Sequence, residues 1–275
     1  MTQSYHARMT PLSSWYDALG PTGRAPLRWL AGWWRIVHFG ALMLVLAMSP
    51  STYRRENRLA LARQLYLDTA PMLLGFTVLC ALISLVLTRI VVVTALSYGL
   101  SQYALEMVIR VLVLELIPLT AALFVALRCT IPHGAELARM RRRGVLDEMR
   151  RSGQDPMRCE LLPRVASGVF GTVMLAMLSC VVALVLAYLT LHGFTLSGLP
   201  AYTRMFGQVF HPAVTLIFLL KTLFFSLAVS AIPMVSGVHD MAGERSRTVA
   251  ELQGLVRMFA VLLLVEVLSL VGNYY

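Results

Sequence analysis

The sequence predicts an all-α polytopic membrane protein. The chain has 275 residues, of which 58% are hydrophobic and only 14% are charged, whereas soluble domains carry about 25% charged residues. So few polar side chains cannot coat a globule of this size, so lipid must supply part of the solvent. The mean hydropathy is +0.71, and apolar stretches recur that are long enough to cross about 30 Å of hydrocarbon as helices. These observations exclude a soluble cytosolic enzyme.

Five stretches have the length and composition of membrane spans. They occupy residues 69–88, 104–127, 165–191, 212–235 and 255–274. An apolar run after Arg89 allows the first span to extend further. The last span contains Arg257 near its start and closes with Asn273, Tyr274 and Tyr275, residue types that suit a membrane interface. We therefore predict five transmembrane helices.

A shorter apolar run precedes these spans. Residues 36–48 are too few to cross the bilayer upright, and they follow a mixture of Trp and Arg that suits the headgroup layer. We predict that residues 26–48 form an interfacial or re-entrant helix, with a sixth full span as the alternative. The predicted organisation is a polar segment at 1–25, this helix and a basic cytoplasmic connector at 26–68, and a five-span domain with a cytoplasmic helix at 69–275.

Positive charge is concentrated in a few connections between the spans. The net charge is +10, and seven arginines lie within residues 129–163, with further ones within residues 51–69 and 237–257. Positively charged loops mark the cytoplasmic face of a membrane protein. Five spans that leave the cytoplasm first and end outside place all three segments on that face. Contact with anionic lipid headgroups explains such loops, and no nucleic-acid role is indicated.

The sequence indicates no metal or nucleotide site in this chain. Four cysteines without the spacing of a zinc site are interpreted as small apolar fillers, namely Cys80, Cys129, Cys159 and Cys180. Three histidines near interfaces stand without an acid or Cys at ligand spacing, namely His38, His192 and His211. No GxxxxGK[ST] motif occurs. We therefore predict no cofactor in this chain.

Charged side chains inside the spans are functional candidates, because each costs at least a few kcal/mol in hydrocarbon. Glu106 and Arg110 are four residues apart and are predicted to pair locally. Glu115 lies about 140° around the helix from Arg110 and needs another partner. Lys221 is the only lysine, and we predict that it pairs with Glu115 or Glu266 across helices. Contact with a lipid headgroup is the alternative, and both hold if the pair lines a cavity.

The longest polar segment between spans is predicted to contain a cytoplasmic helix. We expect one continuous helix of about 17 residues that starts near Glu136 and ends at Gly153, before Pro156. Glycine favours the position after a helix, and proline cannot continue one.

Residues at fixed spacing in and around this segment form a recognisable pattern. Within the segment they are Glu136, Leu137, Met140, Gly153, Asp155, Pro156, Leu161, Pro163 and Arg164. Elsewhere they are Glu115, Leu116, Pro118, Arg128, Lys221, Phe225, Gly237 and Glu266. The pattern resembles the MlaE/YrbE permeases of MCE-type ABC transporters and runs from about Arg63 to the C-terminus. It departs from the family where Leu114 replaces an Arg and where Gly144 and Val145 replace two acids.

The resemblance implies the permease subunit of an ABC transporter that moves phospholipid, or a related hydrophobic molecule, between the inner membrane and an extracytoplasmic MCE carrier. It implies a homodimer in a bacterial inner membrane, without enzymatic activity of its own. The implied partners are an ABC ATPase that binds the ATP, an MCE-domain protein and a STAS-domain protein that binds the ATPase.

The resemblance also assigns roles to the residues above. Residues 136–156 would be the coupling helix that docks on the ATPase, with the candidate positions Glu136, Met140, Asp147, Gly153, Asp155 and Pro156. Glu115, Lys221 and Glu266 would face the lipid headgroup. Two alternatives remain open, a membrane scaffold whose basic helix recruits a soluble partner and an intramembrane transferase that uses Glu115 or a histidine.

Overall fold

The computed structural model describes residues 24–49, 55–99, 101–239 and 247–274, and these ranges contain helices and no strand. The helices from the N-terminus to the end of the second span are α2 (Arg24–Met48), α3 (Arg55–Ser97), α4 (Ser101–Val108), η2 (Ile109–Leu116), α5 (Ile117–Val125), η3 (Ala126–Thr130) and α6 (Ile131–Arg142). They are followed by α7 (Val145–Arg151), η4 (Met157–Leu161), α8 (Leu162–His192), η5 (Leu196–Gly198), α9 (Leu199–Val209), α10 (Pro212–His239) and α11 (Arg247–Tyr274). The predicted all-α class is confirmed.

Five helical segments among the described residues are long and apolar enough to cross a membrane. They are Leu61–Ser97, Leu105–Arg142, Met157–His192, Pro212–Gly237 and Leu252–Asn273. The second of them is a continuous column made of α4, η2, α5, η3 and α6. A shorter apolar helix, Gly32–Ala47, lies near the N-terminus, as predicted.

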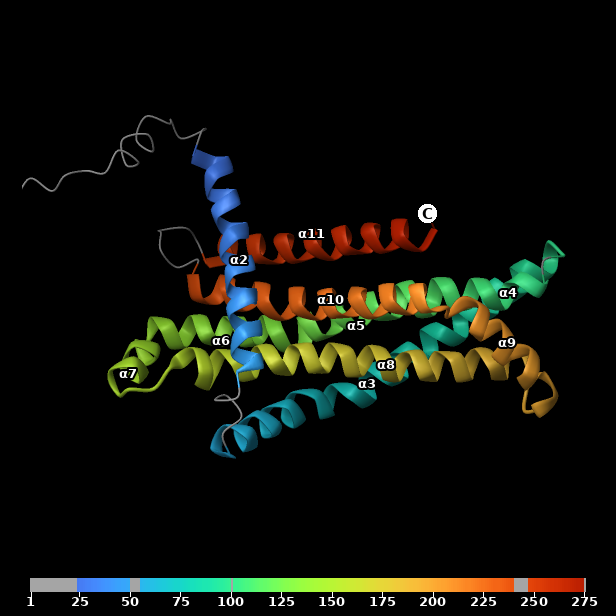
Figure 1. Cartoon of the computed structure of the whole chain (residues 1–275), viewed down its shortest axis with the longest axis horizontal. Coiled ribbons are helices and arrows are strands. Elements are labelled where there is room, and N and C mark those ends of the chain that lie inside the picture. The colour runs from blue at the N-terminus through green and yellow to red at the C-terminus, as the bar shows by residue number, and fades with distance from the viewer. Residues whose placement is uncertain (1–23, 50–54, 100, 240–246, 275) are drawn as a thin grey trace, which may run out of the picture.

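The spans run side by side along the long axis, and α2 crosses them near the end formed by α6 and α7 (Figure 1). The start of α3, the end of α10 and the start of α11 lie at this same end, whereas α4 and α9 lie at the other (Figure 1). The arginine-rich segments therefore gather at one end of the bundle, called the arginine-rich end below. The transverse course of α2 favours an interfacial helix over a sixth span.

The basic connector and the first span are not separate elements at residue 69, because α3 runs without a break from Arg55 past Pro71. Leading residues of a helix can keep their hydrogen bonds while their side chains meet water and headgroups, so composition changes there without a change in backbone. Residues 1–23 of the predicted polar segment and residues 50–54 of the connector lie outside the described residues.

The column Leu105–Arg142 is the centre of the bundle. Its most apolar stretch is 61% buried, against 22% for each of the outer spans Leu61–Ser97 and Leu252–Asn273. Ile109 and Ile117 of the column pack in one core with Phe76 of α3 and Leu175 of α8. A charged side chain on the inward face of this column is consequently enclosed by neighbouring spans, as Glu115 is with 12% of its side chain exposed.

Wide π-helical turns interrupt the column at η2 and η3 and precede α8 as η4. At η2 the N–H of Ile117 bonds to the carbonyl of Leu112, five residues earlier, and the other two turns close in the same way. Two residues after each turn comes a proline, namely Pro118, Pro132 and Pro163. Proline lacks the N–H of the usual bond to the fourth residue back and crowds that carbonyl. The π turns coincide with these missing bonds, and such turns are frequent at functional sites.

The prediction of one continuous helix from Glu136 is wrong. The chain leaves α6 at Arg142, turns, and starts α7 at Val145. Gly144 has φ +73°, in the left-handed region where L side chains are strained. The predicted end of the segment is confirmed, because Gly153 has φ +81° and the next N–H, that of Gln154, bonds back to Met149.

Gly144→Ala is expected to lower the free energy of unfolding by about 1–2 kcal/mol, because the left-handed conformation brings Cβ against the backbone. Gly207→Ala is the matched control, since Gly207 lies in α9 and an added Cβ there would meet no atom within 4 Å. We expect the control to be neutral or slightly stabilising. The measurement is the thermal unfolding midpoint of each variant in detergent, and equal midpoints for Gly144→Ala and wild type would contradict the expectation.

Candidate functional site

Three charged side chains from three spans meet inside the bundle. The ammonium of Lys221, on α10, forms ion pairs with Glu115 of η2 and with Glu266 of α11. The distance from Nζ to Oε2 of Glu266 is 2.9 Å. The Lys221 side chain is 1% exposed, and those of Glu115 and Glu266 are 12% and 15% exposed. The structure thus places the lysine between both carboxylates that the sequence offered as its partners.

A backbone carbonyl completes the surroundings of Lys221. The Nζ atom also donates to the carbonyl oxygen of Leu114, at 3.2 Å. This oxygen lacks its usual helical donor, because the residue four positions on is Pro118. An ammonium has three donor hydrogens, and here it faces three acceptors. The ring of Phe225 lies 5.7 Å from Nζ and adds a cation–π contact.

The carboxylates keep acceptor capacity that Lys221 does not use. Both ion pairs run through Oε2 atoms, and Oε1 of Glu115 accepts a bond from the Asn273 amide at 3.4 Å. With all three groups ionised, the cluster carries a formal charge of −1. Because Lys221 pairs with both carboxylates and is less exposed than either, a group entering from outside meets carboxylate oxygens. Such a site favours hydrogen-bond donors and cations.

The predicted local pair of Glu106 and Arg110 is confirmed. The distance from Arg110 Nε to Glu106 Oε1 is 2.9 Å, and both side chains are more than a quarter exposed. These two charged residues therefore neutralise each other locally, and neither belongs to the buried cluster around Lys221.

At the arginine-rich end, Arg164 fastens α6 to the start of α8. Its guanidinium lies 3.0 Å from Glu160, 3.7 Å from Glu136 and 3.6 Å from the sulfur of Met140. Leu137, next to Glu136 in the sequence, is fully buried. It joins a core cluster with residues of α2, α8 and α10. The predicted positions Glu136 and Met140 therefore hold α6 in place.

The other predicted positions of this segment divide by exposure. Asp155 accepts the N–H of Met157 at 3.0 Å, and Pro156 is buried, so both shape the entry into η4. Asp147 and Gly153 are exposed. The surface of α7 that remains open carries Asp147, Glu148, Arg150 and Arg151.

A close backbone contact joins α6 to α10. A Cβ atom on Gly134 would lie 2.6 Å from the carbonyl oxygen of Pro233, and one on Gly237 would collide with the carbonyl of Gly134. Only glycine fits at these two positions. The helix that carries Lys221 is thereby linked directly to α6.

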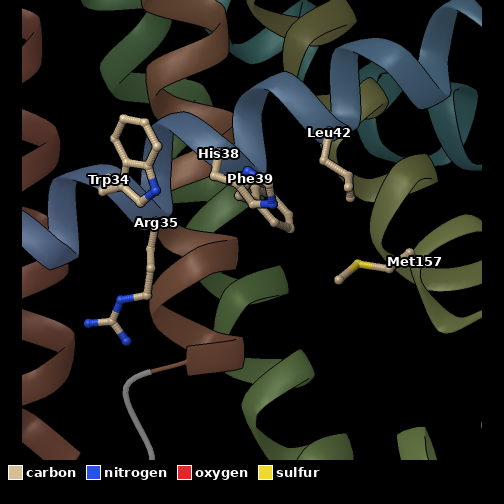
Figure 2. Close-up of a pocket in the computed structure, with 6 residues that line it drawn as sticks. All are labelled: Trp34, Arg35, His38, Phe39, Leu42 and Met157. Carbon is tan, nitrogen blue, oxygen red and sulfur yellow. The ribbon is translucent and has the colours of Figure 1, made fainter. Parts of the chain in front are cut away.

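A cavity of about 330 Å³ opens between α2 and η4. Its lining is Trp34, Arg35, His38, Phe39, Leu42 and Met157. Met157 extends from its own turn towards Leu42 and Phe39 of α2 (Figure 2). The lining is mainly apolar, as expected where an interfacial helix lies across the end of a bundle.

The interpretation of all four cysteines as apolar fillers is wrong for Cys159, which is exposed in η4, whereas Cys80, Cys129 and Cys180 are buried. Sequence reasoning also missed His133, whose ring lies 3.7 Å from the sulfur of Cys129. The spacing of four residues between this Cys and His was the available signal.

Comparison with protein families gives one clear finding. The family model described as Permease MlaE matches residues 61–271. No curated protein matches the chain. The matched range contains all five spans except the last residues of the fifth, together with α6, α7 and the buried cluster.

Proposed function

The chain belongs to the MlaE permease family and is thus the permease subunit of an ABC transporter, and from this premise we propose that it moves a phospholipid or a related hydrophobic molecule to or from an extracytoplasmic MCE-domain carrier. The buried cluster of Lys221, Glu115 and Glu266 carries the proposal, because charges inside hydrocarbon are retained where a substrate needs them. We also propose a homodimer in a bacterial inner membrane.

The chemistry of a lipid divides between its two parts. Acyl chains exchange one hydrocarbon surrounding for another at little cost, so they need only an apolar path. The headgroup loses water and needs polar partners. Oxygens of Glu115 and Glu266 left over from the lysine supply acceptors for an ammonium or for hydroxyl groups. Lys221 acts as a positioning residue, since it holds both carboxylates from adjacent spans.

The α6–α7 segment is proposed as the coupling element for a separate ABC ATPase, which binds the ATP. The exposed surface of α7 lies at the arginine-rich end. The neighbouring helix α6 is fixed to α8 through Arg164 and to α10 through Gly134 and Gly237. Movement of α6 is therefore transmitted to the helix that carries Lys221. An MCE-domain protein would contact the opposite end, and a STAS-domain protein would bind the ATPase.

The direct test is co-expression of the chain with its cognate ATPase, followed by purification and measurement of ATP turnover in nanodiscs. We expect the ATPase to copurify and phospholipid to stimulate turnover. Copurification of a soluble partner without ATPase activity would instead support a membrane scaffold and overturn the proposal.

Reversal of two charges on α7 tests the coupling element. Arg150→Glu combined with Arg151→Glu is expected to weaken binding of the ATPase by at least about tenfold, because each exposed ion pair contributes up to about 1 kcal/mol and reversal adds repulsion. Arg204→Glu, at an exposed position of α9, is the matched control. Retention of ATPase by affinity capture is the measurement, and equal losses in both variants would refute a docking role for α7.

A further inference from the structure

A second polar cluster lies at the arginine-rich end, apart from the lysine cluster and built from other residues. It consists of Asp68 of α3, Cys129 of η3 and His133 of α6. Cys129 and His133 are four residues apart and project from one face of the column, and Asp68 reaches them from the neighbouring span. Three different metal-binding side chains thus converge from two spans.

The distances within this cluster suit a metal ion. The sulfur of Cys129 lies 3.7 Å from Nδ1 of His133, and Oδ1 of Asp68 lies 3.6 Å from Nε2, the other nitrogen of the same ring. Since a histidine binds an ion through one ring nitrogen, only one of these two separations joins two ligands of the same ion. One ligand atom from each residue can be chosen so that all three lie within 4.8 Å of one another. Ligands of a tetrahedral zinc ion, at bond lengths of about 2.0–2.3 Å, stand about 3.3–3.8 Å apart. A shift of about 1 Å therefore closes the set around an ion.

We propose that Asp68, Cys129 and His133 bind a divalent transition metal, with Zn²⁺ as the ion that fits best. Thiolate, imidazole and carboxylate together suit zinc, whereas Mg²⁺ and Ca²⁺ take oxygen ligands. The Cys129 thiol gives its proton to solvent on binding, and thiolate and carboxylate together then balance the charge of the ion. A water molecule completes the coordination.

The surroundings support this assignment. The Asp68 and His133 side chains are each 14% exposed, so an ion can reach the cluster from the surface. Gln64 donates to Oδ2 of Asp68 at 2.9 Å and leaves Oδ1 to the cluster, as an outer partner of a metal ligand does. The nearby cation Arg164 is paired with Glu136 and Glu160, so its charge is compensated.

A bound ion would tie the first turn of α6 to α3. His133 stands near the start of α6, and Gly134 beside it makes the close contact with α10. The metal site is therefore a clip between the outer span α3 and the central column. It stabilises the fold whether or not the transporter is turning over, so its test is independent of the proposed transport.

The test measures zinc in the full-length protein purified without a polyhistidine tag. We expect about one zinc per chain, a rise of the thermal unfolding midpoint when zinc follows chelation, and a sulfur-to-metal charge-transfer band when Co²⁺ is the probe. Cys129→Ser, His133→Gln and Asp68→Asn should each abolish stoichiometric zinc, and Gln64→Leu should weaken it about 10–100-fold. Cys159→Ser, at the exposed cysteine, should bind as wild type does.

Two results would overturn the site. One is wild-type protein that binds no more zinc than Cys129→Ser does. The other is a loss of zinc in Cys159→Ser as large as the loss in Asp68→Asn. Because Asp68→Asn is nearly isosteric and its side chain is partly exposed, this variant is expected to fold even if the cysteine variant does not.

Discussion

Lys221→Met is expected to unfold or severely destabilise the protein. The change leaves two carboxylates, at most 15% exposed, without their shared cation. Removal of one partner from a buried ion pair costs about 3–5 kcal/mol, because the remaining charge has lost both water and counter-ion. The measurement is the fraction of monodisperse protein that survives heating in detergent. Arg110→Met is the control, since both side chains of its pair with Glu106 are more than a quarter exposed and such pairs contribute about 0–1 kcal/mol.

A compensated variant separates stability from transport. Lys221→Met combined with Glu115→Gln and Glu266→Gln removes all three charges, and replacement of a buried ionic group by neutral side chains is often close to neutral for stability. We expect this triple variant to fold and yet to fail in ATP-driven lipid transfer between proteoliposomes and an MCE-domain acceptor. Transport at the wild-type rate by the triple variant would remove the cluster from the proposed mechanism.

Gly237→Ala is expected to have the second largest effect. The new Cβ meets the carbonyl of Gly134, a backbone atom that cannot rotate away, so α6 and α10 must move apart. Overpacking of this kind costs about 1–3 kcal/mol, and loosening of α6 should also reduce the stimulation of ATP turnover by lipid. Both the thermal midpoint and the lipid-stimulated turnover are to be measured.

Gly75→Ala is the matched control for this prediction. Gly75 lies within α3, and no atom is near enough to touch an added Cβ. The control should keep wild-type stability and turnover. A Gly237→Ala variant that behaves like Gly75→Ala would show that the two helices can separate without consequence.

The fold could be predicted from sequence because hydrocarbon imposes a simple requirement, about 20 apolar residues for each crossing. The break at Gly144 could not be predicted with the same certainty, because a single glycine among helix-forming residues is also compatible with a continuous helix. Whether it adopts a positive φ depends on where α7 must pack. The departure from the family pattern at Gly144 and Val145 was the one available signal.

In the candidate sites, too, some features could be predicted from the sequence and others depend on packing. Lys221 could be singled out because a unique lysine in an apolar run needs a partner, and its two acidic candidates were few enough to name. The hydrogen bond from Lys221 to the Leu114 carbonyl was not predicted, because side-chain composition does not reveal backbone acceptors. Pro118 was the available signal, since it lacks the N–H that would bond to this oxygen. The cluster around His133 was missed because Asp68 lies far away in sequence, and only the packing of α3 on the column brings it close.

Pro118 has a consequence for the lysine that goes beyond the shape of the helix. Any other residue at this position would present an amide hydrogen to the oxygen that Lys221 now occupies. The amide and the ammonium would share this oxygen, and the ammonium would be freer to donate to another acceptor, such as a phosphate oxygen. An uncharged pyrrolidine ring thereby leaves the Leu114 oxygen to the ammonium and lowers the affinity of Lys221 for an anion.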